Sequence, residues 1–177
     1  MLSKQKWIEH SDEYDSLLKS AYERLRRRHY TAAIDHLLIR DSWCLKPIAR
    51  QDGNHSWYVV GDIFWHQQKY QLALRAFQKA ARCWPEDAEA QMAIGNCHAE
   101  LNRPKLAERF FRRSLELAPR KTSVKFNLAN ALFDQAEFAG AIQIYRTIER
   151  SNSPLGANAK RNRLLAQHKL ASNTHKT

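Results

Sequence analysis

The alternation of apolar and polar residues along the chain repeats with a period of 34 residues. Three segments align at this period without a gap: 54–87, 88–121 and 122–155. Such a period is typical of a solenoid, because one helix pair cannot bury its apolar face alone and stacked pairs share a continuous core. The chain has only 5 Gly and 5 Pro, which argues against a fold of many short strands. The pattern predicts an all-α chain with one helix pair in each segment.

Small and large residues alternate between the aligned columns in a way that explains the packing of such pairs. Small residues are expected where two antiparallel helices cross, and they occupy one column on each helix: Gly61, Gly95 and Ala129 on the first, Ala73, Ala107 and Ala141 on the second. Large rings that fill the space toward the neighbouring pair occupy another column: Phe77, Phe111 and Tyr145. Pro85 and Pro119 follow the second helices, which they would end. In this scheme His98 replaces Phe64 and Leu132, and we interpret it as a core histidine that makes a hydrogen bond.

These columns resemble those of the tetratricopeptide (TPR) family. The first copy carries the family pattern most fully, in Trp57, Val60, Gly61, Phe64, Tyr70, Ala73, Phe77, Ala80 and Pro85. The resemblance implies a right-handed superhelical solenoid of about four helix pairs plus a C-terminal capping helix. It also implies a module that binds another protein, because TPR proteins hold a partner segment in a concave groove.

The flanks of the repeats extend this picture. Residues 11–43 read as a degenerate helix pair that begins at the N-cap Ser11, with acidic residues in the first turn. Its Tyr30, Ala33 and Leu37 precede the matching residues of the next pair by 40 rather than 34 positions. We therefore predict a linker insertion of about six residues within 44–53. A flexible arm, 1–10, comes before this pair, and its Trp7 and Ile8 suggest an alternative role in dimerisation.

A last helix is expected after the third repeat. Ser153 and Pro154 form a favourable N-cap and first helical position. The helix would cap the stack over residues 156–170, with Leu155, Leu164 and Leu165 covering its open end. Residues 171–177 are expected to be a disordered tail. The oligomeric state is left open.

The resemblance also indicates where a partner would bind, since positions on the first helix of each TPR pair face the groove. The expected groove residues are Tyr58, Asp62, Trp65, His66, Met92, Asn96, Phe126, Asn127, Asn130 and Phe133. Aromatic and methionine side chains supply adaptable contact area, and carboxamides can pair with a peptide backbone. The alternative for the aromatic residues is packing between adjacent repeats.

One known TPR function is not expected. Some TPR co-chaperones clamp an acidic C-terminal tail with lysine, asparagine and arginine side chains. Here Tyr58 stands in place of the lysine and Asp62 in place of the first asparagine. The size of the chain instead resembles that of type III secretion chaperones, and an assembly factor for a secretion system, a pilus or another complex is equally compatible.

The net charge of +11 favours an acidic partner. The second helices carry a set of basic residues that would form a ridge on the convex side: Arg75, Lys79, Arg82, Arg109, Arg112, Arg113, Arg146 and Arg150. Two interpretations stay open for this basic ridge. It is a solvated outer face, or it binds RNA or another polyanion, which is the alternative function.

The sequence contains none of the motifs of common enzymes, such as HExxH, a phosphate-binding loop, GxSxG or CxxC. We expect no catalysis, no cofactor and no metal, and we interpret Asp62, His66 and His55 as groove lining rather than as metal ligands. Three cysteines without a CxxC pair fit a reducing compartment. With no apolar signal or transmembrane segment in the sequence, a cytoplasmic location is expected.

Overall fold

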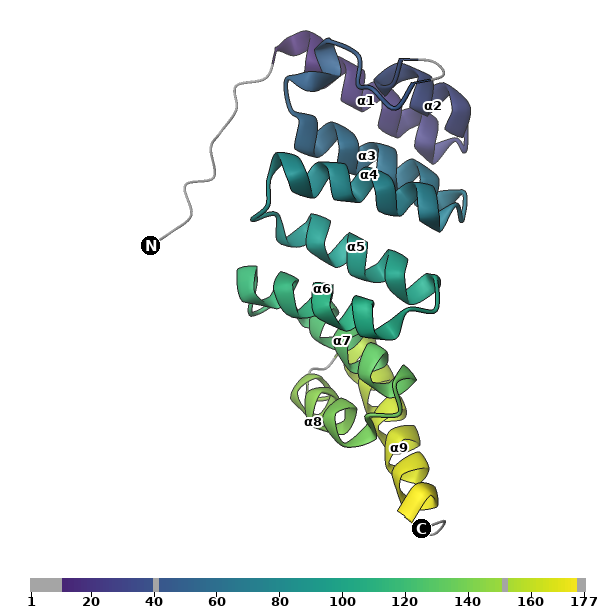
Figure 1. The fold of residues 1–177 in the computed structure, drawn as a ribbon, viewed down its shortest axis with the longest axis vertical. Helices are drawn as coiled ribbons and strands as arrows, with labels where there is room; N and C mark the ends of the chain where they lie inside the picture. The colour runs from purple at the N-terminus through teal and green to yellow at the C-terminus, as the bar shows by residue number, and fades with distance from the viewer. Residues whose placement is uncertain (1–10, 40–41, 151–152, 175–177) are drawn as a thin grey trace. The chain divides into compact units, whose positions relative to one another are not determined.

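The computed structural model describes residues 11–39, 42–150 and 153–174 of the chain (Figure 1). Over these residues it is helical, with an isolated bridge between Leu38 and Leu45 and no strand. The helices are α1 (Asp12–Arg26), α2 (Tyr30–Leu37), the short 3-10 helix η1 (Ile48–Arg50), α3 (Gly53–His66), α4 (Tyr70–Cys83), α5 (Ala88–Glu100), α6 (Pro104–Leu117), α7 (Thr122–Asp134), α8 (Phe138–Ile148) and α9 (Pro154–Thr174). The predicted all-α class and the helix pairs at the 34-residue period are confirmed.

The helices form two compact units, unit 1 (Met1–Pro85) and unit 2 (Glu86–Thr177). In each unit the odd-numbered helices α1, α3, α5 and α7 end in the same way. The residue after the C-cap adopts a left-handed backbone with φ between 55° and 61°, at Arg28, Gln68, Asn102 and Ala136. The next helix begins two residues later. Because the pair α1–α2 shares this turn with the three regular pairs, its local geometry is that of a repeat.

Side-chain caps begin several of these helices. The Ser11 hydroxyl accepts a hydrogen bond from the Tyr14 amide at the start of α1, as the sequence predicts. Asp52 caps α3 through the His55 amide, and Asp87 caps α5 through the Glu89 amide. Each cap satisfies an amide that has no partner inside its own helix, so it fixes where that helix starts.

The described residues between α2 and α3 pack within unit 1, and we call this segment the packed insertion. It begins earlier than the predicted linker, 44–53, because α2 ends at Leu37 and the predicted helix pair, 11–43, is therefore shorter than expected. Leu38, Leu45 and Ala49 are buried. The ring of Trp43 stacks on those of Trp57 and Phe64, with ring centroids 6.1 and 5.6 Å apart. The insertion therefore extends the core of unit 1 and is not a solvent-exposed linker between the helix pairs α1–α2 and α3–α4.

Unit 1 is also tied together by polar contacts between α1 and the start of α3. The buried Tyr14 hydroxyl lies 3.2 Å from the Ser56 hydroxyl and donates a hydrogen bond to the Asp52 carbonyl at 3.3 Å. Burial raises the pKa of Tyr14 to about 12, so this hydroxyl keeps its proton. At the N-terminal end of α1, the Ser11 amide and hydroxyl both donate hydrogen bonds to the side-chain oxygen of Gln51.

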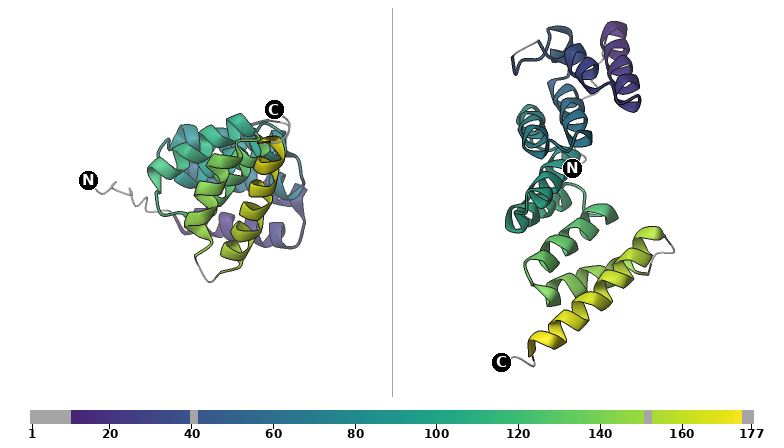
Figure 2. Two further views of the ribbon diagram at one scale, coloured as in Figure 1. Left: turned by 90° about the horizontal axis from the view of Figure 1, so that it is seen from below. Right: turned by 90° about the vertical axis from the view of Figure 1, so that its right-hand side faces the viewer.

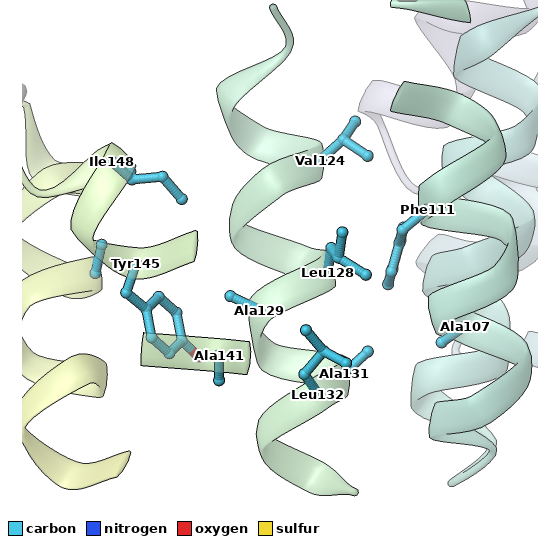
Figure 3. Packing of buried hydrophobic residues seen from close by; sticks show 11 residues of the cluster. Ala107, Phe111, Val124, Leu128, Ala129, Ala131, Leu132, Ala141, Tyr145 and Ile148 are labelled. Atoms are coloured by element: carbon cyan, nitrogen blue, oxygen red, sulfur yellow. The ribbon is translucent and has the colours of Figure 1, made fainter. Parts of the chain in front are cut away.

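The core of unit 2 lies between α6, α7 and α8 (Figure 3). Phe111 of α6 points toward Leu128 of α7, and Tyr145 of α8 points toward Ala129 on the other side of α7. His98 of α5 is buried as expected and stacks on Phe110 at 5.3 Å. The expected hydrogen bond is missing at its Nδ1 atom, which is buried and has no partner among the described residues.

Helix α9 packs against α8 and α7 and is longer than predicted (Figure 2). The Ser153 hydroxyl caps it by accepting from the Gly156 amide at 3.1 Å. Ala166 joins Phe138 and Ile142 in a small cluster, and Leu155 packs on the main core. Two details of the prediction were wrong. Helix α9 continues through residues 171–174, which were expected to be a tail, and it leaves Leu164 and Leu165 exposed instead of covering the stack.

The predicted arm, with Trp7 and Ile8, and residues 175–177 of the predicted tail lie outside the described residues.

Candidate functional site

Five of the six predicted groove residues of unit 2 share one face of two neighbouring helices. Met92 and Asn96 lie on α5, and Phe126, Asn127 and Asn130 lie on α7. All five are half-buried. Met92 and Phe126 pack against the core cluster with one side and leave the other side accessible. We call these five residues the α5–α7 face.

Hydrogen bonds join the asparagines of this face to one another and to the last two helices. The Asn127 Nδ2 group donates to Asn96 Oδ1 at 2.9 Å, which connects α7 to α5. Asn130 Oδ1 accepts from the Tyr145 hydroxyl at 2.6 Å and from Asn162 Nδ2 of α9 at 3.2 Å. Burial raises the pKa of Tyr145 to about 12, so its hydroxyl stays protonated and keeps donating. These contacts hold the carboxamides in fixed orientations.

The unused halves of these carboxamides alternate in chemical character. In the described part of the chain no partner occupies Asn96 Nδ2, Asn127 Oδ1, Asn130 Nδ2 or Asn162 Oδ1. They offer a donor, an acceptor, a donor and an acceptor in turn. We call the four residues Asn96, Asn127, Asn130 and Asn162 the carboxamide ladder. Sequence reasoning missed Asn162, because it lies on α9, outside the 34-residue period.

The ladder ends at a cavity of about 300 Å³ lined by Asn130, Phe133, Asp134, Tyr145, Asn162 and Leu165. The predicted groove residue Phe133 belongs to this wall. Its ring packs against Phe138 at 5.2 Å and against the cluster that contains Ala166 of α9. Phe133 therefore serves the packing of the last helix as well as the cavity. Burial raises the pKa of the Asp134 carboxyl.

The predicted groove residues of unit 1 lie on α3 and are Tyr58, Asp62, Trp65 and His66, which we call the α3 face. Tyr58 packs edge-on against Phe77, with ring centroids 5.1 Å apart, and Trp65 packs edge-on against Tyr70, with ring centroids 5.0 Å apart. Both rings remain half-buried, so packing within their own helix pair uses only part of each surface. His66 is exposed. Both interpretations of these aromatic residues are therefore compatible with the structure, because each ring packs in the core with one side and is accessible on the other.

Asp62 carries a half-buried carboxyl on the α3 face. Burial raises its pKa to about 6, although the nearby His66 acts in the opposite direction. From α1, Tyr22 approaches this carboxyl, and the pKa of its phenol is raised by burial and then by the charge of Asp62. The Tyr22 hydroxyl lies 3.3 Å from Nε2 of His55. No hydrogen bond is donated to Asp62 by any described residue.

Several side chains of the predicted basic ridge are engaged within their own unit. In unit 1 the Arg75 guanidinium lies 4.4 Å from the centre of the Trp43 ring, and the Lys79 ammonium lies 4.0 Å from that of Trp57. Lys79 also donates to the Trp43 carbonyl. These two cations therefore hold the packed insertion in place.

In unit 2 Arg112 pairs with Glu108 at 2.8 Å, and Arg113 pairs with Glu116 at 2.9 Å. The other predicted ridge residues are exposed: Arg82, Arg109, Arg146 and Arg150. Half of the predicted ridge thus has a partner in its own unit, although Arg75, Arg112 and Arg113 remain exposed. Polyanion binding through the ridge stays a prediction.

Among the described residues no group of three or more His, Cys, Asp or Glu side chains could hold a metal ion. No described helix is both long and apolar enough to span a membrane. Cys44 and Cys83 are exposed thiols, and Cys97 is buried.

Solved structures resemble this fold at low sequence identity. The chain aligns with MamA at 14% identity and a TM-score of 0.64, over 85% of this chain and 80% of that one. It aligns with YrrB, a TPR protein with an unusual peptide-binding site, at 19% identity and a TM-score of 0.66, over 85% and 74%. The type III secretion translocator chaperone SycD of Yersinia enterocolitica aligns at 17% identity and a TM-score of 0.62, over 66% and 85%. At these identities the likeness concerns the fold.

A curated relative is the human protein O-mannosyl-transferase TMTC3, which is 28% identical over 105 residues. The alignment takes in 51% of this chain and only 12% of that much longer protein.

The tetratricopeptide repeat family model matches residues 18–87 and 61–121. The two matches together span more than half of the chain and include α2 and the second half of α1, the pair that departs most from the regular period. The chain therefore belongs to the tetratricopeptide repeat family.

Proposed function

We propose that the chain is a protein-interaction module that holds an extended segment of another protein on the α5–α7 face. The observation that supports this most directly is the carboxamide ladder. Its unused groups alternate between donor and acceptor, as do the N–H and C=O groups of a peptide main chain. A surface of this kind binds backbone without depending on one particular partner sequence.

Apolar contacts would supply the rest of the affinity. Each net hydrogen bond contributes only about 1 kcal/mol, so four of them do not make a stable complex. Met92 and Phe126 flank the ladder and are half-buried on the core. A flexible thioether and an aromatic ring accept many side-chain shapes, which suits a segment held mainly by its backbone.

The relatives agree with a binding role. YrrB is a TPR protein with a peptide-binding site, and SycD is a secretion translocator chaperone. We extend peptide binding to this chain on the strength of its own ladder. A chaperone or assembly role in a secretion system or pilus is a narrower prediction, and we propose no catalytic activity for the chain.

Selection from a phage-displayed library of random dodecapeptides tests this function. The informative variant is Asn96→Ala/Asn127→Ala, because each of these side chains bonds to the other and removing both leaves neither unpaired. We expect the wild type to select peptides and the double variant to bind them at least ~10-fold more weakly, which corresponds to about 1.4 kcal/mol.

Asn158→Ala is the matched control, since Asn158 is an exposed asparagine on α9 outside the ladder. Its affinity should equal that of the wild type, with the same helical circular dichroism. A wild type that selects no peptide, or a double variant that binds as well as the control, would contradict the proposal.

A further inference from the structure

We infer that the α3 face of unit 1 recognises a basic side chain, arginine or lysine, of a partner protein through the carboxylate of Asp62. The inference shares with the proposed function the idea that the ligand is a protein segment. It adds a second recognition site and a chemical class of ligand, and it does not depend on the carboxamide ladder.

The first reason is a comparison of equivalent positions in the three repeats. Asp62, Asn96 and Asn130 occupy the same column. Both asparagine oxygens accept hydrogen bonds, from Asn127 in one case and from Tyr145 and Asn162 in the other. Tyr145 belongs to the same helix pair as Asn130, and the residue in its column beside Asp62 is Phe77, which has no hydroxyl. Asp62 is therefore the acceptor of this column that receives no hydrogen bond from any described residue.

The second reason is the electrostatic setting. Other carboxylates of the chain form ion pairs with cations of their own unit: Glu89 with Lys121, Glu108 with Arg112, Glu116 with Arg113 and Glu149 with Arg163. Among the described residues, the charged or titratable groups that act on Asp62 are His66, one turn away, and the Tyr22 phenol from α1. A half-buried carboxylate is poorly hydrated, so a partner's cation gains more there than at an exposed acid.

The third reason is the nature of the surrounding side chains. Tyr58 and Trp65 flank Asp62 on α3, and Tyr22 faces it from α1. All three rings are half-buried. An aromatic face attracts a cation and covers the aliphatic stem that carries it. A carboxylate among such rings favours arginine over lysine, because a planar guanidinium can stack on a ring and donate two hydrogen bonds to the carboxylate at once.

The test uses three dodecapeptide libraries with random flanks and a fixed central residue: arginine, glutamine or glutamate. Their capture is compared for the wild type, Asp62→Asn and Glu100→Gln. The control removes the same charge from an exposed carboxylate of unit 2 that lies outside both candidate sites. We expect the wild type to prefer arginine over glutamine by ~10-fold, as a charge-assisted hydrogen bond allows. The preference should fall to within ~2-fold in Asp62→Asn and persist in Glu100→Gln.

Carboxyl-¹³C NMR gives a second measurement on the wild type. Addition of selected arginine peptides should shift the Asp62 carboxyl resonance and leave that of Glu100 in place. Equal capture of the arginine and glutamine libraries, or an Asp62 resonance that does not respond, overturns this inference and leaves the carboxamide ladder untouched. The reverse outcome is also informative. If Asn96→Ala/Asn127→Ala loses affinity for peptides but still prefers arginine, the ladder and the Asp62 site act independently.

Discussion

The ring of Phe111 lies against the α-carbon of Gly95, so closely that a β-carbon on Gly95 would stand 2.6 Å from ring atom Cε1. The same relationship joins Gly61 to Phe77 in unit 1, where the distance would be 2.5 Å. No real β-carbon makes such a contact with a ring, so these two columns of the repeat depend on each other.

Gly95→Ala should therefore destabilise the protein by about 1–3 kcal/mol, because overpacking of a core outweighs the better helix propensity of alanine. Gly140→Ala is the matched control on α8. Its β-carbon would meet Leu132 at an ordinary 3.5 Å, so we expect a stability gain of about 0.5–1 kcal/mol. Urea unfolding followed by circular dichroism compares the two, and equal effects would show that the Phe111 ring moves aside at little cost.

Asp62→Asn should stabilise the free protein at neutral pH by about 1–2 kcal/mol. A carboxyl whose pKa is raised in the folded state from 3.8 to about 6 contributes its full stability below pH 3.8 and loses it as the pH rises through 6. The ceiling on this loss is about 3 kcal/mol, and partial hydration lowers it. Asparagine does not ionise, so the advantage of the variant should appear between about pH 4 and pH 6 in unfolding curves. A constant difference across this range would contradict the assignment.

His98→Leu should raise stability by about 1–2 kcal/mol. Leucine is the residue of this column in the third repeat, at Leu132, and it removes a buried ring nitrogen that has no partner among the described residues.

The pH dependence gives a second check on His98. Burial, and then the charge of Arg103, lower the pKa of His98. The wild type should therefore lose stability as the pH falls below the ordinary value of 6.5, and the variant should lose less. The exposed His168→Gln is the control, which should leave the pH profile unchanged. A wild-type and a His98→Leu profile that run parallel would argue against this role.

Trp43→Ala should destabilise unit 1 by about 2–3 kcal/mol, because Trp43 stacks on Trp57 and Phe64 and carries the Arg75 guanidinium. Every tryptophan of the chain lies before residue 86, so tryptophan fluorescence reports on unit 1 alone. The fluorescence transition should move to lower urea concentration. Trp84→Ala, at an exposed position, should shift it little. If Trp43→Ala and Trp84→Ala shift the urea transition by the same amount, the contacts of Trp43 do not hold the insertion against α3 and α4.

The 34-residue period predicts the helix pairs because equivalent positions in each repeat meet the same packing requirement. Gly61, Gly95 and the rings opposite them show this, since the crossing of two helices demands a small residue wherever it occurs. The α5–α7 face follows from the same periodicity. Its five residues lie together on two adjacent helices.

Features that occur once in the chain could not be found in this way. Trp43 has no counterpart in the other repeats, and its partners Trp57, Phe64 and Arg75 come from two different helices. Asn162 reaches the ladder only because α9 packs against α7. The exposure of Leu164 and Leu165 has the same origin, since the packing of α9 chooses which of its faces is buried.

The packed insertion between α2 and α3 limits how this chain can evolve by duplication. A TPR array grows when a 34-residue cassette is copied, because each copy meets the same surface on its neighbour. A copy of the first cassette would carry Trp43 with it and would need another Trp57, Phe64 and Arg75 to receive that ring. The contact of Tyr14 with Ser56 adds a second such requirement. The opening helix pair is thus committed to its present neighbour.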